Sequence, residues 1–257
     1  MQSKVKVLKK IILLNKKEGE TPLEALLKFR KKHREYKNIS MTYAGRLDPM
    51  ATGILLVLVG ATVHQKEKYL ALSKEYKFKV LFGFATDTYD ILGLVKNKKL
   101  LNLDEEKELK KSIQDNLKHF IGKFMQKYPL YSSKTVKGKA LFQYAREGET
   151  VEIPKRKVFV RKIELNNFEK IEAKKLLDNI TKRVKKVNGD FRQEKILKVW
   201  KKNILITDQK FLIANIEINC SSGTYVRSIA DELGQLIGMP ALAFSIKRTK
   251  LGKWSKI

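Results

Sequence analysis

The sequence predicts an α+β domain built around a mixed sheet. Of the 257 residues, 43% are hydrophobic, which is enough apolar surface to bury a sizeable core. Segments with strand periodicity and segments with helical periodicity follow one another without the regular alternation of a doubly wound fold. No motif recurs at a fixed spacing, which argues against a repeat architecture. We expect residues 1–257 to form a single domain.

The N-terminal part begins with a strand, a capped helix and a second, fully apolar strand. The short apolar runs KIILLN and ILLVLV predict buried strands. Between them a helix is expected over residues 21–33, because Thr21 is a suitable N-cap and Pro22 a suitable first residue. Glu24 completes a capping box with Thr21. A basic helix is expected around residues 64–72.

The middle of the chain predicts one strand followed by two helices. KEYKFKVLFG predicts a strand with one packed face and one wet face, since apolar side chains alternate with charged or smaller ones. The alternating residues are Tyr76, Phe78, Val80 and Phe82. Residues 102–124 predict a helix with acids at its start and lysines later, as the helix dipole favours. A shorter helix is expected over residues 139–148, closed by Gly148.

The C-terminal part predicts two strands and a helix around a segment without clear periodicity. Residues 153–165 and 211–220 have strand patterns. Residues 224–238 predict an amphipathic helix that ends at Gly238. The intervening residues 166–210 are rich in lysine and match no single period, so we treat them as a candidate insertion in the domain.

The charge of the chain predicts a polyanionic partner. Lys and Arg number 55 against 27 Asp and Glu, which gives a formal net charge of +28. Because the chain can bury a core, this excess belongs to a folded surface rather than to a disordered tail. Short apolar runs and the lack of a basic amphipathic helix favour nucleic acid over a membrane surface. A lysine-rich proteome would produce the same composition.

Composition also argues against metal, disulfide and nucleotide chemistry. Cys220 is the single cysteine, and the three histidines, His33, His64 and His119, are scattered. Neither Gly-rich phosphate loop motif, GxxxxGK[ST] or GxGxxG, occurs. The longest apolar stretch, GILLVLVGA, is too short to span a bilayer, and the N-terminus lacks a signal-peptide core. We expect a soluble, cytoplasmic, monomeric protein that needs neither cofactor nor metal.

Four features are candidates for chemistry or RNA contact. Asp48, in GRLDPMATG, has the context of a simple Asp-Pro turn. Tyr76 begins an alternating strand, where a packed tyrosine is the default. Arg227 lies in the first turn of a helix and opposes its dipole, which an acid from elsewhere in the chain would explain. The clusters KRKVFVRK and IKRTKLGKW interleave basic and apolar residues, as solvated strand faces or RNA-binding surfaces do.

Four motifs in order resemble the TruB family of tRNA pseudouridine synthases. They are TYAGRLDPMATGILLVLVG, KEYKFKVLFGFATDTYDILG, YPLYSSKTVKGKALFQYAREG and INCSSGTYVRSIADELG. The resemblance implies a pseudouridine synthase fold, a mixed, largely antiparallel sheet flanked by helices. It also implies a cofactor-free isomerase that flips the T-loop uridine at tRNA position 55 out of its stack. Its partner would be the T-arm stem-loop of tRNA.

The resemblance also implies roles for individual residues. The family pattern G-x-L-D-P-x-A-T-G places the catalytic carboxylate at Asp48. Tyr76 would stack on the flipped base and assist proton transfer at C5. Arg227, in GTYVR, would form a salt bridge with the catalytic acid. The residues expected to contact RNA are Tyr43, Arg46, Lys16, Lys134, Lys247 and Arg248.

The sequence departs from the family pattern in three places. Most bacterial members have G-H-T-G before the catalytic motif, and here Tyr43 replaces the histidine. The usual lysine of K-x-x-G falls on Thr135, with Lys134 one place earlier. The chain ends soon after the motif IKR, so we expect no C-terminal RNA-binding domain of the PUA type, and surface lysines would supply phosphate contacts instead.

Two alternatives to the T-loop reaction remain. The first is a non-catalytic RNA-binding or RNA-folding protein on the same scaffold, for which the basic surface suffices; the intact Asp48, Tyr76 and Arg227 favour an enzyme. The second keeps the chemistry but changes the substrate to another stem-loop or to a guide-dependent target, as in the dyskerin-like relatives. Tyr43 and the short C-terminus are the reasons to consider it.

Overall fold

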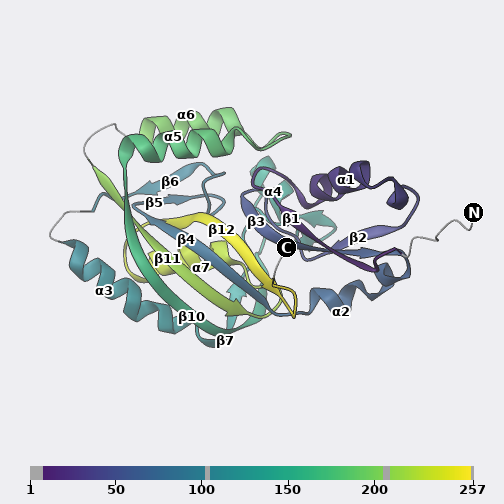
Figure 1. Ribbon diagram of the computed structural model, residues 1–257. Coiled ribbons are helices and arrows are strands. Elements are labelled where there is room, and N and C mark those ends of the chain that lie inside the picture. Colours follow the sequence, from purple (N-terminus) through teal and green to yellow (C-terminus); the bar gives the residue numbers. More distant parts are fainter. Residues whose placement is uncertain (1–7, 102–104, 205–208, 256–257) are drawn as a thin grey trace, which may run out of the picture.

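The computed structural model describes residues 8–101, 105–204 and 209–255, which form one continuous mixed sheet with helices packed against it (Figure 1). Eight strands make up this sheet, in the order β1-β3-β12-β4-β11-β10-β7, with β2 also paired to β3. All pairs are antiparallel except β3 with β12. The prediction of an α+β fold around a mixed, largely antiparallel sheet is therefore confirmed. The strands are β1 Ile11–Lys16, β2 Met41–Ala44, β3 Ala51–Val59, β4 Lys74–Phe82, β7 Gly122–Lys127, β10 Lys155–Glu172, β11 Lys210–Cys220 and β12 Ala241–Leu251.

The described part of the chain also contains two small hairpins, seven α-helices and three short 3₁₀ helices. The hairpins pair β5 Phe84–Thr86 with β6 Val95–Lys98, and β8 Thr135–Val136 with β9 Lys139–Ala140. The helices are α1 Pro22–Lys32, α2 Lys66–Leu70, α3 Glu106–Asn116, α4 Leu141–Glu147, α5 Ala173–Val184, α6 Gln193–Asn203 and α7 Val226–Leu236. No helix among the described residues is both long and apolar enough to cross a membrane.

Local sequence signals set several of these boundaries. At the start of α1, the Thr21 hydroxyl accepts a hydrogen bond from the Glu24 backbone at 3.2 Å, and the Glu24 carboxylate accepts one from the Thr21 backbone at 2.7 Å. This is the predicted capping box. Gly148 ends α4 in the left-handed conformation, with φ 72°, which suits a residue without Cβ.

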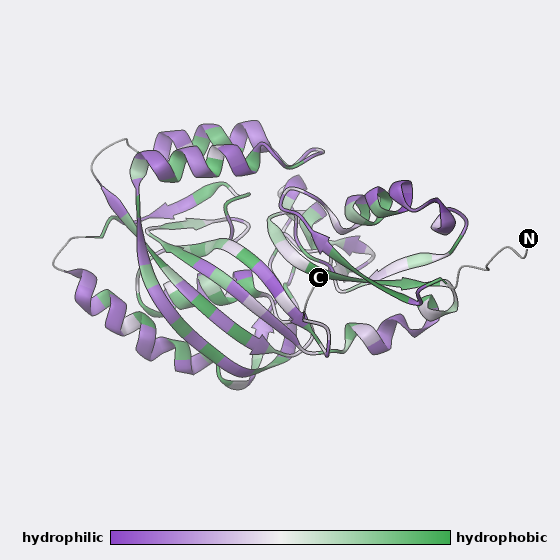
Figure 2. Ribbon diagram, in the orientation of Figure 1, coloured by the Kyte–Doolittle hydropathy of each residue, from purple (hydrophilic) through white to green (hydrophobic). Residues whose placement is uncertain are grey.

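The large sheet has a core on each face. On one face, α3 and α7 pack against alternate residues of β4 and β11, including Tyr76 and Phe78. On the other face, α5 and α6 cover the opposite residues, and Trp200 of α6 donates its indole N–H to the Ile91 carbonyl at 3.2 Å. Green and purple bands alternate along the strands in Figure 2, as the two-residue period requires. Leu81 belongs to the second core, between Val80 and Phe82 of the first.

The structure corrects three sequence expectations. The helix predicted over residues 102–124 ends at Asn116, and Gly122, at φ 96°, turns the chain into β7, which pairs with β10. The strand predicted over residues 153–165 continues to Glu172. The basic helix expected around residues 64–72 is only the five-residue α2, after a 3₁₀ turn.

The Lys-rich segment 166–210 forms ordinary secondary structure. It contains the end of β10, helices α5 and α6, and the first residue of β11, while positions 205–208 lie outside the described residues. Helices α5 and α6 lie side by side over β5 and β6 in Figure 1. Their apolar stripes include Leu176 and Ile180, which are fully buried. The segment therefore contributes to the core as well as to the surface.

Candidate functional site

A cavity of about 610 Å³ opens beside the junction of β3 with β12. It is large enough for a nucleobase and its sugar. Residues far apart in the sequence line it, and among them are all three that the resemblance places in catalysis, Asp48, Tyr76 and Arg227. The fold therefore brings together side chains that the sequence separates by as many as 179 positions.

Asp48 lies on the loop between β2 and β3, and close backbone packing fixes that loop. A Cβ added at Gly53 would lie 2.2 Å from the Arg248 carbonyl oxygen, and φ there is 100°, so only glycine lets β3 approach β12 this closely. On the other side, the Gly19 backbone donates a hydrogen bond to the Pro49 carbonyl at 2.9 Å. The loop that carries Asp48 is thus held from two directions.

Arg227 is the hydrogen-bond partner of the Asp48 carboxylate. Its Nε donates to Asp48 Oδ2 at 2.8 Å, and its side chain is only 4% exposed while that of Asp48 is 40% exposed. Nη1 donates to the Thr88 carbonyl, and Nη2 donates to the Tyr131 carbonyl at 3.3 Å. An arginine in the first turn of α7 is therefore explained by acceptors outside its helix. The carboxylate keeps one face open to the cavity.

Asp90 is a second carboxylate beside the same arginine. Its Oδ2 lies 3.8 Å from Arg227 Nε, and its Oδ1 accepts from the Thr88 hydroxyl at 2.7 Å and from the Leu92 backbone at 3.0 Å. Burial raises the pKa of Asp90, and Arg227 opposes that rise. Burial lowers the pKa of Arg227, but Asp48 and Asp90 outweigh it and the pKa is raised, so the guanidinium stays charged.

Sequence reasoning assigned no role to Asp90. A signal was present, because the turn in FATDTYDILG holds two acids in a strongly basic chain. Short polar side chains that bond their own turn produce the same pattern, and Thr88 and Asp90 do bond each other. The pattern alone therefore could not separate a turn from a site.

Tyr76 forms part of the wall of the cavity. It lies on β4 opposite Arg248 of β12, and its side chain is buried. Burial raises the pKa of its phenol, and the charge of Arg248 opposes the rise. The phenol therefore stays neutral near pH 7, where it can stack through its ring and donate or accept a hydrogen bond. Lys74, two residues earlier on β4, also lines the cavity, and burial lowers its pKa to about 8.

Four of the six residues expected to contact RNA have accessible side chains. Tyr43 and Arg46 lie at the cavity, Tyr43 half-buried and Arg46 exposed. Lys134 and Lys247 are also exposed, and the Lys134 ammonium lies 5.7 Å from the centre of the Tyr128 ring. These positions leave the four side chains free to meet a polyanion.

The other two, Lys16 and Arg248, do not fit that expectation. The Lys16 ammonium is buried and donates to the carbonyl oxygens of Lys17 at 2.9 Å and Glu20 at 2.6 Å. The Arg248 guanidinium is buried, and its Nε donates to the Ile54 carbonyl at 2.7 Å. Both cations satisfy backbone acceptors inside the protein, so they support the loops around the site and have no surface to offer a phosphate.

Arg156 is a cavity residue that sequence reasoning placed only within a basic cluster. Its side chain crosses Gly223, where an added Cβ would lie 2.2 Å from the guanidinium carbon. Nearby, the buried Gln126 fixes the backbone of Tyr225 through two hydrogen bonds, at 2.8 and 3.2 Å. The chain before α7 therefore forms a firm edge of the cavity, with an exposed arginine over it.

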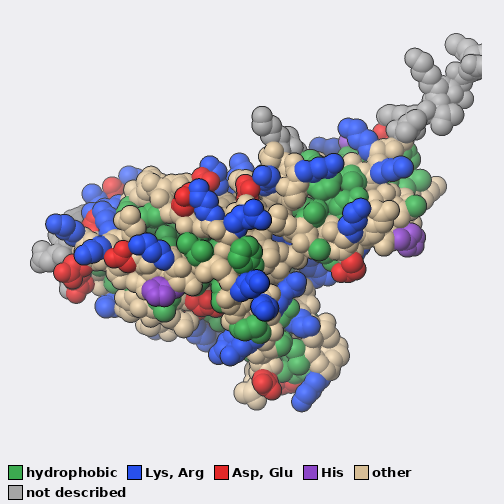
Figure 3. Space-filling view, turned by 90° about the horizontal axis from the view of Figure 1, so that it is seen from below, with side chains coloured by type: hydrophobic (Ala, Val, Ile, Leu, Met, Phe, Trp, Pro, Cys, Tyr) green, Lys and Arg blue, Asp and Glu red, His purple; other side chains and the backbone are tan. Residues whose placement is uncertain are grey.

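The outer surface is predominantly basic. On the face shown in Figure 3, Lys and Arg side chains are spread widely, and acidic side chains are fewer. Elsewhere in the described chain, exposed lysines pair with acids, as Lys77 does with Glu217 at 2.7 Å. Across the residues that the structure describes, no group of three or more His, Cys, Asp and Glu side chains is arranged to hold a metal ion.

Comparison with known proteins identifies the family. Residues 31–191 match the model of the TruB family pseudouridylate synthase, N-terminal domain. The tRNA pseudouridine synthase B of Lactobacillus acidophilus is 32% identical over 238 residues, which cover 93% of this chain and 67% of the relative. Those of Borreliella afzelii and Carboxydothermus hydrogenoformans are 32% and 33% identical, and the match covers 94% of this chain and 69% of each relative. The chain thus spans about two thirds of the length of these curated relatives.

Solved structures agree at the level of the fold. The structure titled "Crystal Structure of a Cbf5-Nop10-Gar1 Complex" contains a chain that matches 96% of this one with a TM-score of 0.54 and 17% identity. A second, an H/ACA RNP bound to a substrate RNA containing 2′-deoxyuridine, matches with a TM-score of 0.51 and 16% identity. This chain spans about half of each of those chains. From the family model and the curated relatives together, the chain belongs to the TruB family of pseudouridylate synthases.

Proposed function

We propose that this protein isomerises the uridine at position 55, in the T-loop of tRNA, to pseudouridine, with Asp48 as the catalytic carboxylate. One observation carries the proposal: a buried arginine holds Asp48 at 2.8 Å, and the carboxylate is still 40% exposed towards a cavity of nucleotide size. The names of the curated relatives support tRNA as the substrate.

The reaction rearranges one nucleotide without net gain or loss of atoms. The bond from C1′ to N1 breaks, the uracil turns, and a bond from C1′ to C5 forms while the C5 proton leaves and N1 gains one. Asp48 acts in the first step as an anion, whether it attacks the sugar carbon or removes a sugar proton. Arg227 fits the role of its fixed counter-charge, since it is buried and its pKa is raised.

Tyr76 is proposed to contact the flipped base. Its ring lies in the cavity wall, and its phenol is neutral near pH 7, because burial raises its pKa. Stacking on that ring would compensate the flipped base for the stacking it loses in the T-loop. The hydroxyl would serve the proton transfer at C5.

The rim of the cavity is proposed to receive the RNA backbone. Tyr43 occupies the place of the usual family histidine, and its aromatic ring can fill the space that the base leaves. Arg46 and Arg156 are exposed cations at the same opening. Lys134 and Lys247 lie on the surface and are proposed to meet phosphates farther away.

The catalytic unit is proposed to be a single domain that acts as a monomer in the cytoplasm. One continuous sheet carries both sides of the cavity, since β3 and β12 join its two parts. No second copy is needed to supply any of the three proposed catalytic residues, because all three line one cavity of one chain.

The test maps pseudouridine in defined transcripts. An unmodified tRNA transcript, a T-arm minihelix and a transcript with cytidine at position 55 are incubated with the protein, and pseudouridine is located by carbodiimide labelling and primer extension. We expect one modified position, U55, in the first two transcripts and none in the third. Modification at another uridine would point to a different stem-loop. Tight binding without any product would support a purely RNA-binding role.

A further inference from the structure

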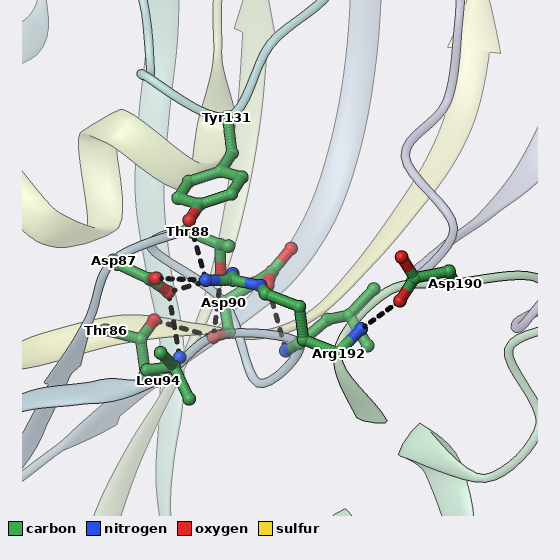
Figure 4. Close-up of polar contacts among 9 residues, drawn as sticks. Thr86, Asp87, Thr88, Asp90, Leu94, Tyr131, Asp190 and Arg192 are labelled. Carbon is green, nitrogen blue, oxygen red and sulfur yellow. Dashed lines mark hydrogen bonds and ion pairs between the residues drawn. The ribbon is translucent and has the colours of Figure 1, made fainter. Parts of the chain in front are cut away.

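The loop between α5 and α6 brings Arg192 to the wall of the cavity (Figure 4). Arg192 precedes α6 in the left-handed conformation, at φ 63°, which residues with a Cβ seldom adopt. The contacts around it must hold that conformation in place. Its backbone N–H donates to the Asp190 carboxylate at 3.2 Å, which tightens the turn. From this turn the Arg192 side chain extends towards Asp87 and Tyr131 (Figure 4).

The Arg192 guanidinium contacts two side chains, the Asp87 carboxylate and Tyr131, and it meets both the hydroxyl and the ring of the tyrosine. Nη1 donates to Asp87 Oδ2 at 2.8 Å and to the Tyr131 hydroxyl at 2.6 Å. The guanidinium carbon lies 4.4 Å from the centre of the Tyr131 ring. The side chain is 22% exposed and that of Asp87 is 12% exposed, so this ion pair is largely screened from water. Burial and the charge of Asp87 raise the pKa of Tyr131, which keeps its phenol neutral.

Both partners belong to segments that hold Arg227. Asp87 Oδ1 accepts from the Leu94 backbone at 2.8 Å and closes the turn that carries Thr88, and the Thr88 carbonyl accepts from Arg227. The carbonyl of Tyr131 accepts from Arg227 as well, at 3.3 Å. Arg192 therefore contacts both segments whose backbone carbonyls, those of Thr88 and Tyr131, accept hydrogen bonds from Arg227.

The α5–α6 hairpin, which consists of these two helices and the loop between them, is also anchored to the segment before α1, to α1 itself and to β12. Arg183 of α5 pairs with Glu18 at 2.7 Å, in the segment between β1 and α1, and donates to the Phe244 carbonyl at 2.8 Å. Asn188 donates to Glu24 at 3.1 Å. The hairpin thus bridges the segment before α1 and the turn that carries Asp87, so Arg192 acts from a fixed support.

We propose that Arg192 is a positioning residue for pseudouridine formation and that the α5–α6 hairpin is part of the active-site structure of this chain. The proposal rests on the proposed function, since it concerns the same cavity. Arg192 acts by fixing Tyr131 and the Asp87 turn, and through them the orientation of Arg227 against Asp48. It makes no contact with the reacting atoms.

The test measures single-turnover rates at saturating enzyme and tRNA affinity, separately, for Arg192→Ala. The matched control is Lys195→Ala, which removes the same charge from an exposed position in the first turn of α6. We expect Arg192→Ala to slow the single-turnover rate by about tenfold to a hundredfold, as displaced catalytic groups do, with the dissociation constant for tRNA unchanged. Lys195→Ala should match the wild type. Arg192→Lys should recover only part of the rate, because lysine keeps the charge and loses the planar stack on Tyr131.

A double-mutant cycle with Tyr131→Phe separates positioning from folding. The two substitutions should be non-additive in the single-turnover rate, since each removes the same contact. An Arg192→Ala rate equal to that of Lys195→Ala overturns the inference. A second result would also overturn it. If Arg192→Ala binds tRNA more weakly and with a smaller salt dependence, while its rate at saturating enzyme is unchanged, Arg192 is a phosphate contact. A wild-type protein that forms no pseudouridine would overturn the proposed function itself, and the positioning role with it.

Discussion

Two pairs of acidic side chains lie at helix α7, and they differ in whether an arginine accompanies them. At the N-terminal turn, Asp48 and Asp90 flank Arg227 at 2.8 and 3.8 Å. One turn farther along the helix, no arginine among the described residues accounts for the pKa of Asp231 or Glu232. Burial raises the pKa of Asp231 to about 6. Burial and the charge of Asp231 raise the pKa of Glu232 to about 7, against a weaker opposing effect of Lys127.

The difference shows what Arg227 contributes. Burial raises the pKa of both Asp231 and Glu232, and the weaker effect of Lys127 on Glu232 does not reverse the rise, so both carboxyl groups are partly neutral near pH 7. A reaction that begins with a carboxylate anion needs a fixed cation beside it, and Arg227 is buried, charged and shared between two acids. Both line the cavity, but the Asp48 side chain is 40% exposed and that of Asp90 only 7% exposed. Asp48 is therefore suited to chemistry, and Asp90 to supporting the arginine.

Removing the cation should produce the largest effect. Arg227→Gln leaves Asp48 and Asp90 without their counter-charge, and we expect the single-turnover rate to fall by about a hundredfold or more. The free energy of unfolding should fall by about 3–5 kcal/mol, because a buried ion pair is broken on one side. Urea denaturation and rate measurements well below the unfolding transition separate the two effects. Arg227→Lys is the control that keeps the charge, and a rate equal to wild type in Arg227→Gln would contradict the account.

Neutralising Glu232, one acid of the second pair, should change the free energy of unfolding in a pH-dependent manner. The folded pKa of Glu232, about 7, lies above its unfolded value, so its contribution to stability is present at low pH and is lost as pH rises through 7. Glu232→Gln should therefore match the wild type near pH 4 and be more stable by about 1–3 kcal/mol at pH 8. Glu152→Gln, at an exposed position, is the control. A difference between Glu232→Gln and wild type that stays constant from pH 4 to 8 would be inconsistent with a raised pKa.

Charges at the rim should have the smallest effect, on binding alone. Arg156→Ala should weaken tRNA binding a few-fold and reduce the slope of log affinity against log salt by about 1, since one phosphate contact is lost. The rate at saturating enzyme should be unchanged. Lys111→Ala, on the exposed face of α3, is the matched control. If the two variants have equal slopes of log affinity against log salt, Arg156 does not contact the RNA.

Much of the fold follows from local patterns. The capping box of Thr21 and Glu24, the alternation along β4 and the glycine that closes α4 each act within a few residues, and the structure has them where the sequence predicts. The sequence did not predict strand β12, because IKRTKLGKW was interpreted as a basic cluster. Its Arg248 is buried by contact with β3, and a single strand does not reveal which neighbour it will meet.

The same limit applies to the site. Asp48 and Arg227 could be paired in advance because the motifs resemble a family and because an arginine opposing a helix dipole needs an acid. Arg192 could not be placed, since it meets Asp87 from 105 positions away and lies in a segment without clear periodicity. Lys16 looked like any other lysine in a chain of net charge +28, and only tertiary burial distinguishes it.

The most direct test of the account compares two acid-to-amide substitutions in one assay, tritium release from C5-labelled uridine in an unmodified tRNA transcript. Asp48→Asn removes the acid paired with Arg227, and Asp231→Asn removes a buried acid of the second pair, which accepts from Gln235 at 2.6 Å. The account predicts that the wild type and Asp231→Asn release tritium and that Asp48→Asn releases none. Release by Asp48→Asn at the wild-type rate would contradict the assignment of the catalytic carboxylate.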